Sequence, residues 1–122
     1  MKRLYTTLAT LALCIISIWA NDTTHLYRID IHQEIGSTSW RYLQNGMHKA
    51  IQKDADAVIL HLNTYGGLVL HADSMRTLIL NAPIPVYAYI ENNAASAGAL
   101  IALACDSIYM QSGARMGAAT VV

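Results

Sequence analysis

The chain has 122 residues, of which 54% are hydrophobic, and its eight basic and eight acidic side chains give a formal net charge of zero. This length and composition predict one compact domain. A balanced charge provides no field that would attract nucleic acid, so binding to nucleic acid is not expected.

The N-terminal twenty residues differ from the rest of the chain. A short basic start precedes apolar or small residues from position 4 to position 19, and Ala20 comes before a polar stretch. This pattern is typical of a secretory signal peptide over residues 1–20, which leaves residues 21–122 as an exported, extracytoplasmic domain. An uncleaved membrane anchor is the alternative, because the bulky Ile18 lies two residues before Ala20.

Residues 26–35 alternate between apolar and polar side chains, which predicts a half-buried strand. The alternation puts Ile29 and Ile31 on one face and Asp30 and His32 on the other. Asp and His are residue types that bind metals, but alternate residues on an exposed strand face are usually only solvated. We therefore expect no metal site in this chain.

The next segments predict a helix and a second strand. Apolar residues recur every three or four positions from Trp40 to Ile51, as in an amphipathic helix, and Ser39 is placed to cap its start. Residues 57–62 form a nearly continuous apolar run, which suits a parallel strand covered on both faces.

The second half of the chain continues this alternation. A second helix is expected to bury one apolar face, formed by Leu68, Ala72, Met75 and Ile79. A third strand over residues 86–90, a third helix over residues 97–104 and a fourth strand over residues 107–110 follow. Such alternation indicates an α/β fold with parallel strands and right-handed crossover helices.

One strand-to-helix turn, residues 92–98, contains Ser96 among alanines and glycine. The small neighbours would let a substrate carbonyl approach, and the helix that follows directs N–H groups to the same place. Ser96 is therefore a candidate nucleophile. The alternative is a small residue needed only for close helix packing.

A second turn, residues 63–67, is expected at the same edge of the sheet, because the carboxyl ends of parallel strands meet there. The N–H of Gly66 or Gly67, together with that of Ala97, would form an oxyanion hole beside Ser96. None of the five histidines and none of the lysines is well placed as a base for Ser96. Cys105 is expected to be a small buried hydrophobic residue.

Several segments, in this order and spacing, resemble the ClpP-class serine proteases, and most closely their membrane-bound NfeD type: residues 64–67, 83–86, 94–98 and 113–122. The resemblance extends from about residue 26 to residue 122. It implies the ClpP/crotonase-like fold, with Ser96 as nucleophile, Gly67 and Ala97 as oxyanion donors and Gly66 as a further candidate donor. Tyr65 stands where the class usually has proline.

The resemblance also implies a Ser/Lys dyad whose lysine follows residue 122. We therefore expect a protease domain that is incomplete at its C-terminus, and a 122-residue piece that is inactive. No cofactor is implied. The implied partners are polypeptide substrates, namely apolar segments of membrane-associated, stomatin-like proteins, and further copies of the chain in a homo-oligomer. The full-length protein is expected to be membrane-bound.

Two other functions remain open from the sequence. A crotonase-like acyl-CoA enzyme would share the fold and use backbone N–H groups on a thioester carbonyl. A catalytically inactive assembly module would keep the fold without a base.

Overall fold

The computed structural model describes residues 23–119, so the signal peptide expected over residues 1–20 lies outside the described part. The elements, in chain order, are β1 (Leu26–Ile31), α2 (Ser37–Gln52), β2 (Ala57–Thr64), α3 (Val69–Leu80), β3 (Val86–Ala95), α4 (Ala97–Leu103), β4 (Ser107–Met110) and β5 (Arg115–Gly117). The predicted α/β alternation is confirmed. Within residues 23–119, no helix has the length and apolar character needed to cross a membrane.

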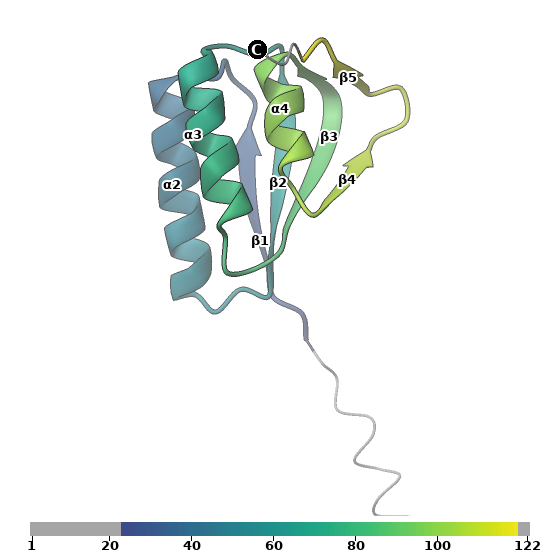
Figure 1. Ribbon diagram of the computed structural model, residues 1–122. Helices are drawn as coiled ribbons and strands as arrows, with labels where there is room; N and C mark the ends of the chain where they lie inside the picture. The colour runs from purple at the N-terminus through teal and green to yellow at the C-terminus, as the bar shows by residue number, and fades with distance from the viewer. Residues whose placement is uncertain (1–22, 120–122) are drawn as a thin grey trace, which may run out of the picture.

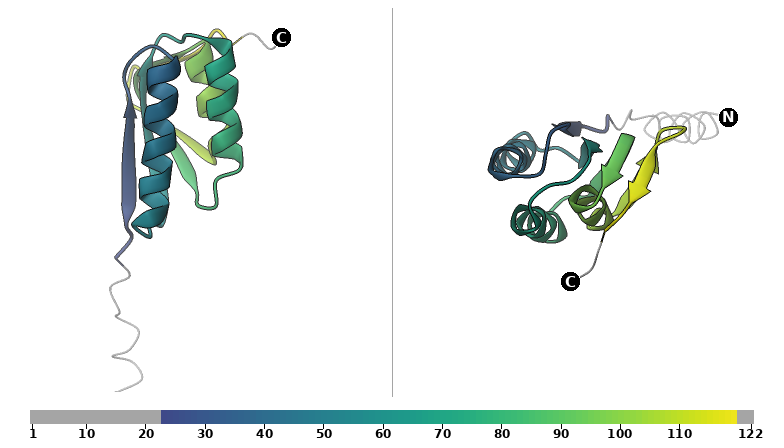
Figure 2. Two further views of the ribbon diagram at one scale, coloured as in Figure 1. Left: turned by 90° about the vertical axis from the view of Figure 1, so that its left-hand side faces the viewer. Right: turned by 90° about the horizontal axis from the view of Figure 1, so that it is seen from above.

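The strands form one parallel sheet in the order β1-β2-β3-β4, and the helices α2, α3 and α4 lie together on one face of it (Figures 1 and 2). The long strand β3 pairs with β2 along one edge, and two short strands share its other edge. Residues 87–90 pair with β4, and residues 93–95 pair with β5. Because all strands run the same way, their carboxyl ends share one rim.

The core fills the space between the sheet and the three helices. Alternate strand residues supply one side of it, and the inward faces of the helices supply the other, so that the largest fully buried side chains include Ile29, Ile31, Leu43, Leu60, Leu62, Met75, Ile90 and Ile101. Burial of each such side chain stabilises the fold by about 1.5–3 kcal/mol. The intervening strand residues, such as Asp30 and His61, lie on the face that carries no helix.

The first strand is shorter than the sequence predicts. It ends at Ile31 instead of residue 35, and Ile35 makes only an isolated bridge to Gly67. The Ile35 N–H donates to the Gly66 carbonyl at 2.8 Å, and the Ile35 carbonyl accepts from the Leu68 N–H at 2.8 Å. The chain therefore leaves the sheet after β1 to hold the glycine turn in place.

Two helix-start predictions are wrong. Ser39 lies inside the first turn of α2, where its Oγ accepts a hydrogen bond from the Gly36 N–H at 2.9 Å, and Gly36 takes the N-cap position. Leu68 is exposed and not part of the core, because its extended backbone (φ −73°, ψ 124°) precedes the first turn of α3. The other members of that predicted face, Ala72, Met75 and Ile79, are buried.

Candidate active site

Ser96 lies between the last residue of β3 and the first residue of α4, on the rim formed by the carboxyl ends of the strands. The residue is exposed, and its backbone has φ 52° and ψ −116°. An L-residue rarely adopts a positive φ, and such strained residues cluster at functional sites where the surrounding structure holds them. The exposed, strained serine is the geometry expected of a nucleophile turn.

Hydrogen bonds on both sides hold the Ser96 backbone in this conformation. The Ser96 N–H donates to the Gly117 carbonyl at 2.8 Å, and the Ser96 carbonyl accepts from the N–H groups of Ala99 and Leu100 at 3.0 and 3.2 Å. The first of these bonds ties the turn to β5. The sequence does not predict this contact, because a three-residue strand has too few positions to show a periodic pattern.

The glycine turn packs against the serine turn. Gly66 has φ 115°, and a methyl group placed on it would lie 2.9 Å from Ser96 Cβ. Gly67 has φ 153°, and a methyl group there would overlap the backbone of Ile35. Both positions thus require glycine for their backbone conformation and for the close approach of a second chain segment.

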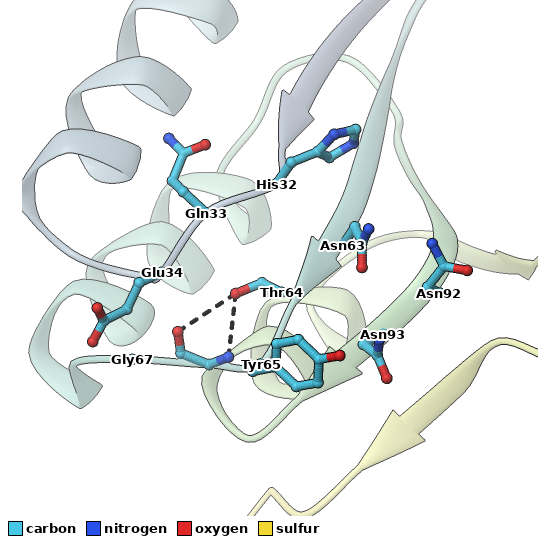
Figure 3. Close-up of a pocket in the computed structure, with 10 residues that line it drawn as sticks. His32, Gln33, Glu34, Asn63, Thr64, Tyr65, Gly67, Asn92 and Asn93 are labelled. Carbon is cyan, nitrogen blue, oxygen red and sulfur yellow. Dashed lines mark hydrogen bonds between the residues drawn. The ribbon is translucent and has the colours of Figure 1, made fainter.

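The backbone N–H groups around Ser96 differ in whether they are already paired. The Gly66 N–H donates to Thr64 Oγ1 at 3.2 Å, an interaction drawn in Figure 3. The N–H groups of Gly67 and Ala97, in contrast, have no acceptor within residues 23–119. Of the three candidate donors, Gly67 and Ala97 are therefore the two that can bind an incoming oxygen atom.

A cavity of about 740 Å³ lies beside the glycine turn (Figure 3). Its walls come from the segments that follow β1 and β2 and from the last part of β3, and are formed by His32, Gln33, Glu34, Asn63, Thr64, Tyr65, Gly66, Gly67, Asn92 and Asn93. This volume lies in the range of sites that hold a small ligand or a few residues of a peptide.

Among residues 23–119, no general base contacts the Ser96 hydroxyl. Its Oγ has no hydrogen-bond partner among residues 23–119, and the two lysines in that range, Lys49 and Lys53, lie exposed near the end of α2. His61, which the sequence places in a buried strand, is indeed buried, and its hydrogen bonds join it to β1.

Comparison with known proteins agrees with the geometry. The family model "NfeD1b, N-terminal domain" matches residues 25–122. The membrane protein NfeD1b of Bacillus subtilis (strain 168) is 42% identical over 97 residues, which are 80% of this chain and 22% of that protein. The chain thus spans about a fifth of the length of this relative.

Several of the similar solved structures are proteases. The 1510-N membrane protease specific for a stomatin homolog from Pyrococcus horikoshii has a TM-score of 0.73 and 31% identity, covering 79% of this chain and 50% of that chain. A lysine-to-alanine mutant of the 1510-N membrane-bound stomatin-specific protease, in complex with a substrate peptide, has a TM-score of 0.77 and 30% identity, covering 83% of this chain and 48% of that chain. ClpP1 from Listeria monocytogenes, at 21% identity, shares the fold with a TM-score of 0.68, covering 75% of this chain and 55% of that chain.

These matches confirm the predicted ClpP-like fold and the predicted resemblance. The chain belongs to the family of NfeD1b N-terminal domains.

Proposed function

We propose that this domain supplies the nucleophile and the oxyanion hole of an extracytoplasmic serine endopeptidase. The observation that carries the proposal is the exposed Ser96, held at a positive φ beside the unpaired N–H groups of Gly67 and Ala97. A nucleophile with two preorganised donors next to it is the arrangement that acyl transfer needs.

In the proposed reaction, Ser96 Oγ attacks the carbonyl carbon of the scissile peptide bond while a base removes the hydroxyl proton. The N–H groups of Gly67 and Ala97 donate to the oxyanion that forms. Collapse of this intermediate breaks the C–N bond, and the leaving amine takes the proton from the base. Water then hydrolyses the acyl-enzyme by the same steps, which releases the acid product and restores Ser96.

We assign the role of base to a lysine in the part of the protein that follows residue 122, so the 122-residue piece alone is inactive. The absence of a base near Ser96 among residues 23–119 supports this assignment. The relatives support it as well, because the 1510-N protease has been solved both as a serine-to-alanine and as a lysine-to-alanine mutant. A lysine acts as a base when burial lowers its pKa enough to make it neutral.

The proposed substrates are apolar segments of membrane-associated, stomatin-like proteins. Apolar side chains next to the glycine turn support this choice: Tyr65 is 81% exposed, Leu70 is 75% exposed, and Leu68 and Val69 are exposed between them. An exposed apolar rim beside a nucleophile favours an apolar peptide by burying its side chains. The specificity of the 1510-N protease for a stomatin homolog supports the same class of substrate.

The proposal extends to placement and assembly. We infer that residues 1–20 direct export, that the full-length protein is bound to the membrane, and that the domain works in a homo-oligomer. Cross-linking of the full-length protein in its native membrane tests assembly: a ladder of multiples of one chain is expected, and a single monomer band would contradict it.

Peptide cleavage by the full-length protein tests the function. We expect cleavage of apolar stomatin-derived peptides, and a loss of about three orders of magnitude or more in kcat with Ser96→Ala. Ser74→Ala is the matched control, because Ser74 lies on α3 and its Oγ donates to the Leu70 carbonyl in the same helix. Equal activity of Ser96→Ala and Ser74→Ala would contradict the proposal. Saturable binding of acyl-CoA without cleavage would instead favour a crotonase-like enzyme, and neither activity would favour an inactive assembly module.

A further inference from the structure

A cluster of metal-binding side chains lies on the face of the sheet opposite the helices. Asp30 on β1 pairs in register with His61 on β2, and His32 follows two residues later on the same side of the chain. One ligand atom from each of the three residues lies within 4.8 Å of the other two. We propose that Asp30, His32 and His61 bind a divalent transition metal of the zinc class, in contrast to the expectation from sequence that the chain holds no metal.

The spacing of the three ligand atoms fits one face of a tetrahedron. His61 Nδ1 lies 2.8 Å from Asp30 Oδ1 and 3.3 Å from His32 Nε2, and His32 Nε2 lies 3.9 Å from Asp30 Oδ1. Ligands at the usual 2.0–2.2 Å from a tetrahedral zinc ion are about 3.3–3.6 Å apart. The three atoms therefore need only sub-ångström shifts to share one ion.

The other ring nitrogen of His61 gives an independent indication. The residue is only 8% exposed, and its Nε2 is buried with no hydrogen-bond partner within the described part of the chain. A metal on Nδ1 leaves the proton on Nε2, and Glu91 Oε2 is 3.8 Å away. A small movement of Glu91 would pair them, giving the carboxylate–histidine–metal arrangement that orients metal-binding histidines.

The position between Asp30 and His61 already attracts a cation. Arg28 Nε donates to Asp30 Oδ1 at 2.6 Å, and Arg28 Nη2 lies 2.6 Å from His61 Nδ1. The Arg28 side chain is exposed, so it can move away into solvent when a metal binds. The guanidinium and the metal therefore compete, and removal of Arg28 should raise the metal affinity.

The site borders the cavity beside the glycine turn, because His32 also lines that 740 Å³ cavity. A bound metal would fix the His32 ring and the start of the segment that leads to Ile35. Binding of the metal does not depend on peptidase activity, so the two proposals can fail separately.

Titration of the untagged chain, stripped with EDTA, with Zn²⁺ and with Co²⁺ tests the site. We expect one equivalent to bind and Co²⁺ to show the intense visible bands of a tetrahedral complex. His32→Asn should weaken binding at least tenfold, and because His32 is exposed this variant should fold. Glu91→Gln should weaken binding by about 10–100-fold while keeping the Co²⁺ spectrum. Arg28→Met should strengthen it.

His48→Asn is the matched control, since His48 is an exposed histidine on α2. It should leave the affinity unchanged, and circular dichroism confirms the fold of each variant. No saturable binding, equal losses in His32→Asn and His48→Asn, or an unchanged affinity in Arg28→Met would overturn the proposal.

Discussion

Gly66 packs directly against Ser96, so that a methyl group on Gly66 would come within 2.9 Å of Ser96 Cβ and 3.1 Å of the Ala95 carbonyl oxygen. The two turns that follow β2 and β3 are therefore one structural unit. The serine keeps its position only while its neighbour has no side chain.

Gly66→Ala should displace the Ser96 turn. The added methyl group must push against Ser96, and alanine also resists the φ of 115°, so we expect a loss of stability of about 1–3 kcal/mol. Labelling of Ser96 by an active-site probe in the full-length protein should fall at least tenfold. A variant that is labelled at the normal rate would show that the two turns are not coupled.

Gly67→Ala should lower the stability of the fold. Its methyl group would overlap the backbone of Ile35, which cannot rotate away as a side chain can. We expect a destabilisation of more than about 2 kcal/mol in urea unfolding. Gly36→Ala is the control, since a methyl group on Gly36 has nothing within 4 Å. Similar losses of stability in the two variants would contradict the close contact between Gly67 and the backbone of Ile35.

The contact between α4 and β2 can be tested with one substitution that adds a methyl group to it and a second substitution that removes a methyl group from it. A methyl group on Gly98 would lie 2.6 Å from Thr64 Cγ2, so Gly98→Ala should destabilise the domain by about 1–3 kcal/mol. Thr64→Ser removes that methyl group but keeps the hydroxyl that accepts from the Gly66 N–H. The double variant should be more stable than the sum of the single effects predicts, and strict additivity in urea unfolding would contradict the close contact.

Cys105 is half-buried and not fully buried as the sequence predicts, and its thiol should react slowly in the folded chain. Burial, together with the negative charge of Asp106, raises the pKa of its thiol from 9.0 to about 12. In a Cys14→Ser background, alkylation at pH 9 should be two to three orders of magnitude slower in buffer than in urea, because the thiolate is the reactive form.

The same shift makes stability depend on pH. The folded thiol holds its proton more tightly than the unfolded thiol, so its contribution to stability is fully present below pH 9 and is lost as the pH rises toward about 12. The difference in unfolding free energy between the Cys14→Ser protein and its Cys105→Ala derivative should narrow over that range. Equal alkylation rates in buffer and urea would contradict the burial of the thiol.

Local patterns predicted most of the fold, because the helices and the first strand show periodic apolar faces and the second strand shows a nearly continuous apolar run. The strand predictions that were wrong concern segments whose partners lie far away in the sequence. Residues 93–95 stay in β3 because β5 pairs with them, and β5 itself has only three residues. Ile35 leaves the first strand because it bridges to Gly67, far along the chain.

The candidate site was predictable where it rests on residue types at a strand-to-helix turn, as with Ser96 and the two glycines. The pairing of each N–H could not be predicted, because Thr64 gives no periodic signal for its hydrogen bond to Gly66. The proposed metal site likewise depends on a contact between two strands. Asp30 and His61 meet only through the register of two strands, which the sequence of either strand alone does not show.

The most direct test of the central proposal is to treat the full-length membrane protein with a fluorophosphonate probe and locate the adduct by peptide mass spectrometry. We expect one adduct, on Ser96, which disappears in Ser96→Ala and persists in Ser74→Ala. The 122-residue chain, treated in the same way, should be labelled far more slowly. A full-length protein that is never labelled on Ser96, or that is labelled equally on other serines, would contradict Ser96 as the nucleophile.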